Sequence, residues 1–334
     1  MAQATTTSPT REETVLTRLW GWIRRIPPIF PVLIVIFLAV GYLNPNFLTT
    51  PGALAFLRRA APLAILAIGQ LFVIASGGLD LSVGSLVTFV VIGSALLIDN
   101  DPNKAMPAIL IMLGIGVLVG LINGIAVAYF KIPSLIATLG MLLMLKGAGL
   151  YWTGGAPRGY LTDNFRFFGR GFIENFPLVE RFPVPVLILL AVGIAAYVIF
   201  HMTNLGRSIL AVGDNPTASR LSGIHVRKVR IIAFILSSVF AIIAGIMVGG
   251  FGGVTIIAGD GLELQAISAA VLGGAVLLGG RGSVPNVIAG ALTLEALFNL
   301  LNLLGLPKPL RDAVQGLIII GAVAYTALAA RRRK

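Results

Sequence analysis

Residues 201–230 read HMTNLGRSILAVGDNPTASRLSGIHVRKVR and are the most basic interval between two apolar spans of the chain. The interval carries a single acid, Asp214, and five basic side chains: Arg207, Arg220, Arg227, Lys228 and Arg230. Long apolar stretches lie on both sides of it. The interval therefore reads as a polar loop around which a membrane-embedded chain is organised.

The middle of this loop predicts a short helix with both ends specified. Asp214 and Asn215 can cap free backbone N–H groups, Pro216 suits the first helical position, and Gly223 suits a left-handed exit. The helix between them, Pro216 to Ser222 with Ser219 and Arg220, spans about two turns and is too short to be stable alone in water. It therefore needs support from its own membrane domain or from a partner.

Two interpretations of the loop follow from the residues alone. It is either an ordinary connector whose arginines reflect membrane orientation, or a docking element for a cytosolic partner.

Composition places the chain in a membrane. Of 334 residues, 57% are hydrophobic and 11% are charged, whereas soluble domains are about 25% charged. Several apolar runs reach the ~20 residues that a bilayer core requires. The net charge of +12 comes from basic residues in short loops and tails, which indicates membrane orientation and not nucleic-acid binding. With no cysteine and two histidines, the sequence predicts neither disulfides nor a metal site.

We predict an all-α polytopic protein with about ten transmembrane helices, and the very short links between the third and fourth and between the eighth and ninth spans leave eight or nine crossings as an alternative. The expected spans are 27–43, 54–75, 82–98, 106–128, 133–153, 183–200, 231–250, 264–280, 284–304 and 310–329.

Lysine and arginine predict the orientation. With the N-terminus inside, 15 basic residues fall on the cytoplasmic side and nine on the opposite side, so both termini are expected to be cytoplasmic. The expected domains are a cytoplasmic tail with an amphipathic helix (1–26), a permease domain (27–330) and a basic C-terminus (331–334). An outer loop at 154–182 forms either a small cap or a passive linker.

Two glycine pairs interrupt the apolar runs. The first glycine break, SGGLDLSVGS (76–85), contains Gly77, Gly78 and Asp80, and Asp80 is placed to cap the following span. The second glycine break, GGRGS (279–283), contains Gly279, Gly280 and Arg281. Both breaks fall on the same predicted side, so an Asp80–Arg281 contact is a testable expectation.

Polar side chains are scarce within the spans. Buried amides and hydroxyls need partners, which are either neighbouring helices or a polar solute. The candidates for a solute pathway are Gln70, Asn123, Thr138, Gln265 and Asn299. The chain contains no G-x-x-x-x-G-K-[ST] phosphate loop, so it is not expected to hydrolyse nucleotide by that route.

Four stretches in order resemble one family. They are GGLDLSVGS (77–85), NGIAVAYFKIPSLIATLGML (123–142), GRSILAVGDNPTASRLSGI (206–224) and ELQAISAAVLGGAVLLGGRGS (263–283). They are similar to the permeases of the ribose/xylose class, the monosaccharide-type ABC importers of bacteria. The resemblance covers nearly the whole chain beyond the N-terminal tail.

The resemblance implies a multi-pass permease of the bacterial inner membrane that carries a sugar-like solute by alternating access. It implies three partners: a cytosolic ABC ATPase that holds ATP and magnesium, a second permease subunit and a periplasmic sugar-binding protein. Residues 206–224 are similar to the segment that couples to the ATPase. Two alternatives remain open, an ion-coupled carrier and an integral membrane enzyme, although no catalytic constellation is found in the chain.

Overall fold

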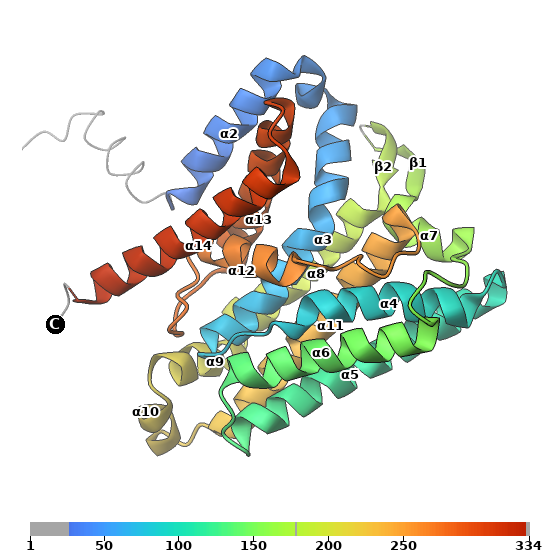
Figure 1. The fold of residues 1–334 in the computed structure, drawn as a ribbon. Helices are drawn as coiled ribbons and strands as arrows, with labels where there is room; N and C mark the ends of the chain where they lie inside the picture. The colour runs from blue at the N-terminus through green and yellow to red at the C-terminus, as the bar shows by residue number, and fades with distance from the viewer. Residues whose placement is uncertain (1–26, 178, 332–334) are drawn as a thin grey trace, which may run out of the picture.

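The computed structural model describes residues 27–177 and 179–331, arranged as a helical bundle with one small β-hairpin (Figure 1). The predicted amphipathic helix in residues 1–26 and the basic residues 332–334 lie outside this range. The helices and strands are α2 (Ile29–Leu43), α3 (Thr50–Ala75), α4 (Ser82–Ile98), α5 (Ala105–Ala128), α6 (Ser134–Thr153), α7 (Asp163–Arg170), β1 (Phe172–Phe176), β2 (Val179–Pro183), α8 (Val184–Tyr197), α9 (Asn204–Asp214), α10 (Pro216–Leu221), α11 (Val226–Gly252), α12 (Leu262–Leu272), α13 (Val284–Leu303) and α14 (Lys308–Arg331).

Each of the ten apolar stretches expected to span the membrane contains one of these helices. Within the described residues, six helical segments are long and apolar enough to cross a bilayer, while α2, α4 and α12 are shorter apolar helices. The six are Thr50–Ala75, Pro102–Ala128, Ser134–Thr153, Val184–Met202, Val226–Gly252 and Val284–Leu303. The predicted all-α membrane class is thus confirmed for the membrane-embedded part.

Helix α12 differs from the predicted span. It ends at Leu272, so the expected helix over 264–280 is wrong in its second half. Gly273 lies so close to α13 that a Cβ there would approach Asn286 O to 2.5 Å, and Gly274 has φ +86°. The chain therefore leaves the helix at this glycine pair and turns toward the second glycine break.

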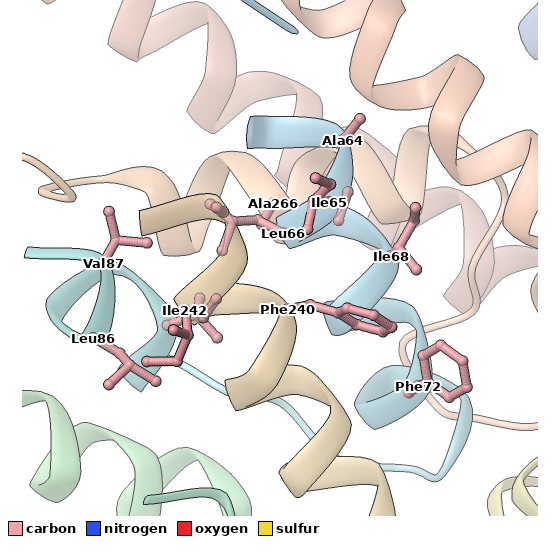
Figure 2. Close-up of a cluster of buried hydrophobic side chains, with 14 of the residues drawn as sticks. Ala64, Ile65, Leu66, Ile68, Phe72, Leu86, Val87, Phe240, Ile242 and Ala266 are labelled. Atoms are coloured by element: carbon pink, nitrogen blue, oxygen red, sulfur yellow. The ribbon is translucent and has the colours of Figure 1, made fainter. Parts of the chain in front are cut away.

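Helix α11 lies at the centre of the bundle. It packs along α5, α3 and α4, and its neighbour α3 is buried through most of its length. Phe72 of α3 is fully buried and lies beside Phe240 of α11 (Figure 2), with 5.9 Å between the ring centres. The Phe72 ring also lies 5.4 Å from that of Phe200. These contacts fix α3 and α11 as one unit.

The loop at 154–182 is folded, which favours a cap over a passive linker. Phe165 of α7 is fully buried, and α7 packs on α11 so closely that a Cβ on Gly169 would come within 2.3 Å of Met247 O. Strands β1 and β2 pair antiparallel, with Glu174 opposite Arg181. The helix and hairpin therefore cover one end of the bundle (Figure 1).

Small residues let α5 approach α11. A Cβ added to Gly120 would lie 2.5 Å from Ile235 Cα and 2.7 Å from Phe234 O. On the same helix, a Cβ on Gly114 would meet no atom within 4 Å. Gly120 is therefore required by the backbone contact between the two helices, and Gly114 is not.

We expect Gly120→Ala to lower the stability of the purified chain by about 1–3 kcal/mol, because the added methyl group must push α5 away from α11. Thermal unfolding in detergent measures the change. Gly114→Ala is the matched control and is expected to leave stability unchanged or slightly higher, since alanine favours helix. Equal losses in both variants would contradict this packing.

Candidate coupling site

The predicted short helix in the polar loop exists as α10. Asn215 Oδ1 accepts hydrogen bonds from Thr217 N and Ala218 N, both at 3.0 Å, and Pro216 occupies the first helical position. Helix α10 ends at Leu221, one residue before the predicted end, and Gly223 follows with φ +82°. Both end signals in the sequence are therefore confirmed.

Helix α9, which the sequence analysis did not predict, connects α10 to the bundle. Thr203 caps it by accepting from Gly206 N at 3.4 Å. Ile209 and Val212 are fully buried, and α9 contacts α3 and α11. Threonine at the start, followed by apolar residues at 205, 209 and 212, is a helical signal that sequence reasoning could have found.

The end of α9 lies against both glycine breaks. Gly280 N donates to Ala75 O at 3.0 Å, which joins the second break to the end of α3. A Cβ on Gly213 would lie 1.9 Å from Ala75 O and 2.5 Å from Gly280 N. Gly279 and Gly280 have φ +95° and +76°, and Gly77 has φ +85°. The polar loop and the two breaks therefore meet through backbone alone, and we call this contact the three-way junction.

A buried carboxyl group holds the first glycine break. Asp80 Oδ1 accepts from Ser82 N at 3.0 Å and from Ser82 Oγ at 2.6 Å, while Asp80 Oδ2 accepts from Ser237 Oγ of α11 at 2.9 Å. Gln70 Nε2 donates to Asp80 O, and Asn123 Nδ2 donates to Ser82 Oγ at 3.0 Å. All five residues are buried, so side chains from α3, α4, α5 and α11 converge on this break.

Helix α6 completes this arrangement. Ser134 Oγ accepts from Leu79 N at 3.1 Å, and Thr138 Oγ1 accepts from Leu81 N at 3.0 Å. Two backbone N–H groups of the first break are thereby satisfied by side chains of a neighbouring helix.

The predicted Asp80–Arg281 contact does not form. Asp80 has no exposed surface and its bonds go to serines, whereas Arg281 is exposed. The second break meets the first through the Gly280–Ala75 backbone bond instead. The expectation was wrong because a same-side placement gives no information on side-chain direction.

The other predicted site residues are distributed over the loop and the later helices. Gln265 on α12 and Asn299 on α13 are half-buried and take no part in the Asp80 contacts. Ser219 of α10 is buried, and Arg207 donates to Asn204 on the exposed side of α9. Asp214 is the last residue of α9 and is exposed.

A basic cavity of about 620 Å³ lies beside α10. Its cationic lining residues are Lys131, Arg220, Arg227 and Arg230, and among the described residues no acidic side chain lines it. The Arg227 guanidinium carbon lies 4.9 Å from the centre of the Tyr129 ring, which holds it at the cavity wall. This side of the bundle therefore attracts anionic groups, acidic side chains included.

The fold defines a polytopic helical membrane protein, and comparison with known proteins specifies its kind. Residues 52–323 match the family described as the permease component of the branched-chain amino acid transport system, and the chain belongs to this family. It is therefore a membrane-embedded permease subunit, a transport component and not an enzyme.

Whole-chain relatives agree with the resemblance drawn from the four motifs. The ribose import permease protein RbsC of Escherichia coli (strain K12) is 38% identical over 300 residues, covering 87% of this chain and 90% of that protein. RbsC of Bacillus subtilis (strain 168) is 34% identical over 308 residues, covering 91% and 92%. The autoinducer 2 import system permease protein LsrC of Escherichia coli O157:H7 is 30% identical over 313 residues, covering 90% and 86%. No solved structure matches the chain.

The contribution of the Asp80 hydrogen bonds to stability can be tested by replacing two buried serines, only one of which contacts Asp80. We expect Ser237→Ala to lower stability by about 1–3 kcal/mol, because it leaves Asp80 Oδ2 buried without its donor. Ser94→Ala removes a buried hydroxyl that has no hydrogen-bond partner in the structure, and should be neutral or stabilising. Thermal unfolding of both variants measures the difference, and a larger loss for Ser94→Ala would refute the assignment.

Proposed function

We propose that this chain is the membrane subunit of an ATP-driven importer that carries a sugar-like solute across the bacterial inner membrane. Its partners are a cytosolic ABC ATPase that binds ATP and magnesium, a second permease subunit and a periplasmic binding protein. The observation that carries the proposal is the three-way junction, because it connects an exposed docking helix directly to interruptions within the membrane domain.

The proposed topology has ten crossings with both termini in the cytoplasm. Basic residues support it, since the polar loop and the 129–133 link, with Lys131, lie beside the same cavity. In this topology α10 and the basic cavity face the cytosol, and α7 with the hairpin covers the outer face.

In the proposed mechanism, closure of the ATPase subunits moves α10. The helix alone is six residues long and transmits force only through what it contacts. Helix α9 carries the displacement to Ala75 and Gly280, which shifts the two glycine breaks against each other. Alternation between outward and inward openings follows if ATP and the loaded binding protein favour different states.

The chemical class of the solute is a separate part of the proposal. The family description refers to branched-chain amino acids, whereas relatives matching about nine-tenths of the chain are named for ribose and autoinducer 2. The relatives that match nearly the whole chain, at 30–38% identity, support a sugar-like solute for this chain.

Reconstitution tests the proposed function. Proteoliposomes containing the chain, its ATPase and the binding protein are expected to take up ribose when ATP is supplied, and not leucine. Uptake by the chain alone, driven by a proton or sodium gradient, would establish the ion-coupled carrier instead. Leucine uptake with ATP would support an ATP-driven importer but contradict a sugar-like solute.

The exit of α10 gives a second test. Gly223 has φ +82° and a Cβ there meets no atom within 4 Å, so only backbone strain opposes a side chain. We expect Gly223→Val to reduce co-purification of the ATPase, because valine disfavours this conformation. Gly223→Asn, which tolerates it, should retain the ATPase. Equal recovery with both variants would count against α10 as the docking helix.

A further inference from the structure

A charged pair lies on the exposed face of α6 at membrane depth. Lys146 Nζ is 3.7 Å from Asp260 Oδ2, and the two side chains are 48% and 50% exposed. Lys146 lies about 18 Å along the axis from the first residue of α6 and about 10 Å from the last. Most of α6 is exposed, so this pair faces outward from the bundle.

Asp260 is held at this depth by its own loop. Gly259 N donates to Thr88 Oγ1 of α4 at 2.9 Å, Asp260 N donates to Ile257 O at 3.2 Å, and Gly261 has φ +85°. The short side chain of Asp260 therefore cannot extend to the lipid headgroups. Its carboxylate also keeps the Lys146 ammonium group nearby. Charged side chains in a span face water or protein and not lipid, so this face of α6 meets one of those two.

The small cavity beside the pair is lined by both polar and apolar side chains. Glu263 of α12 lies within electrostatic range of both Asp260 and Lys146, and Ser85 and Thr88 line the same small cavity. That cavity measures only about 20 Å³, enough for one water molecule and too small for a sugar. A solute at this position must therefore be enclosed from the other side by a second surface.

The face has room for such a surface. Added Cβ atoms on Gly140 and Gly147, which lie about 100–120° around α6 from Lys146, would meet nothing within 4 Å, so the free surface extends around the helix from the pair. Trp152, 42% exposed, stands with its ring 5.8 Å from that of Phe89 beside the charged pair. An aromatic ring next to paired donors and acceptors suits a molecule with hydroxyl groups and an apolar ring face.

We propose that Lys146 and Asp260 contact the transported solute as it passes between this face of α6 and a second permease subunit, and that the solute is an uncharged polyhydroxyl compound. The inference rests on the proposed function. Lysine supplies donors and aspartate supplies acceptors, which together match hydroxyl groups. The two charges of the pair cancel, so an uncharged solute leaves the pair balanced, whereas a charged solute competes with one partner for the other.

The absence of cysteine from the sequence allows a direct test. Lys146→Cys introduces a single thiol into the full-length chain, assembled with its partners in proteoliposomes, and a membrane-impermeant maleimide reports its access to water. Val35→Cys on α2 is the control, because Val35 is 65% exposed on an apolar helix. Labelling is followed without solute, with ribose and with leucine.

We expect Lys146→Cys to react about tenfold faster than Val35→Cys or more, because the thiolate is the reactive form and apolar surroundings suppress it. Ribose should slow the labelling, and leucine should not. Labelling as slow as that of Val35→Cys, or a disulfide between two copies with no labelling, overturns the solute contact. Protection by leucine overturns the polyhydroxyl class.

A transport measurement separates this inference from the proposed function. In Asp260→Asn, ribose uptake should need a higher ribose concentration for half-maximal rate, because the neutral amide is a weaker acceptor for the solute hydroxyl groups. Unchanged concentration dependence in a complex that transports ribose overturns the solute contact alone. Absence of ATP-driven uptake in the unmodified complex overturns the proposed function, whatever the labelling shows.

Discussion

The backbone of Gly213 lies against Ala75 O and Gly280 N in a space that no side chain can enter. This contact decides how the polar loop relates to the membrane domain. It adds a backbone connection between α9 and the second glycine break to the buried packing of α9 on α3 and α11. With it, α9 presses on the end of α3 and on the second glycine break together, and both breaks take backbone conformations that glycine permits.

The Asp80 contacts make the first glycine break rigid enough to be moved as a unit. A carboxyl group within an apolar bundle is unfavourable unless its oxygens are satisfied, and here serines from α4 and α11 satisfy both. The break's N–H groups are satisfied in turn by Ser134 and Thr138 of α6. Displacement of α3 at Ala75 is therefore conveyed to α4, α6 and α11 through hydrogen bonds with few alternative partners.

Local signals in the sequence predicted the helices well but predicted the tertiary contacts between them poorly. Asn215, Pro216 and Gly223 specify α10 because capping and φ preference are properties of neighbouring residues. Helix α12 was extended too far because the Gly273–Gly274 turn depends on close contact with α13. The residue types of Gln70, Asn123 and Thr138 indicated a need for partners, but not that the partners lie at the first glycine break, because period and composition do not specify side-chain direction.

We propose that Gly213 transmits ATPase movement to the membrane domain, and solute uptake by the assembled importer carrying Gly213→Ala is the decisive measurement. A methyl group at this position must displace α9 from Ala75 and Gly280, while the Asn215 cap of α10 is formed by neighbouring residues and does not involve Gly213. We expect this variant complex to assemble and to hydrolyse ATP at the unmodified rate but to lose most of its solute uptake. Uptake that stays proportional to ATP hydrolysis in this variant would show that Gly213 does not transmit the movement.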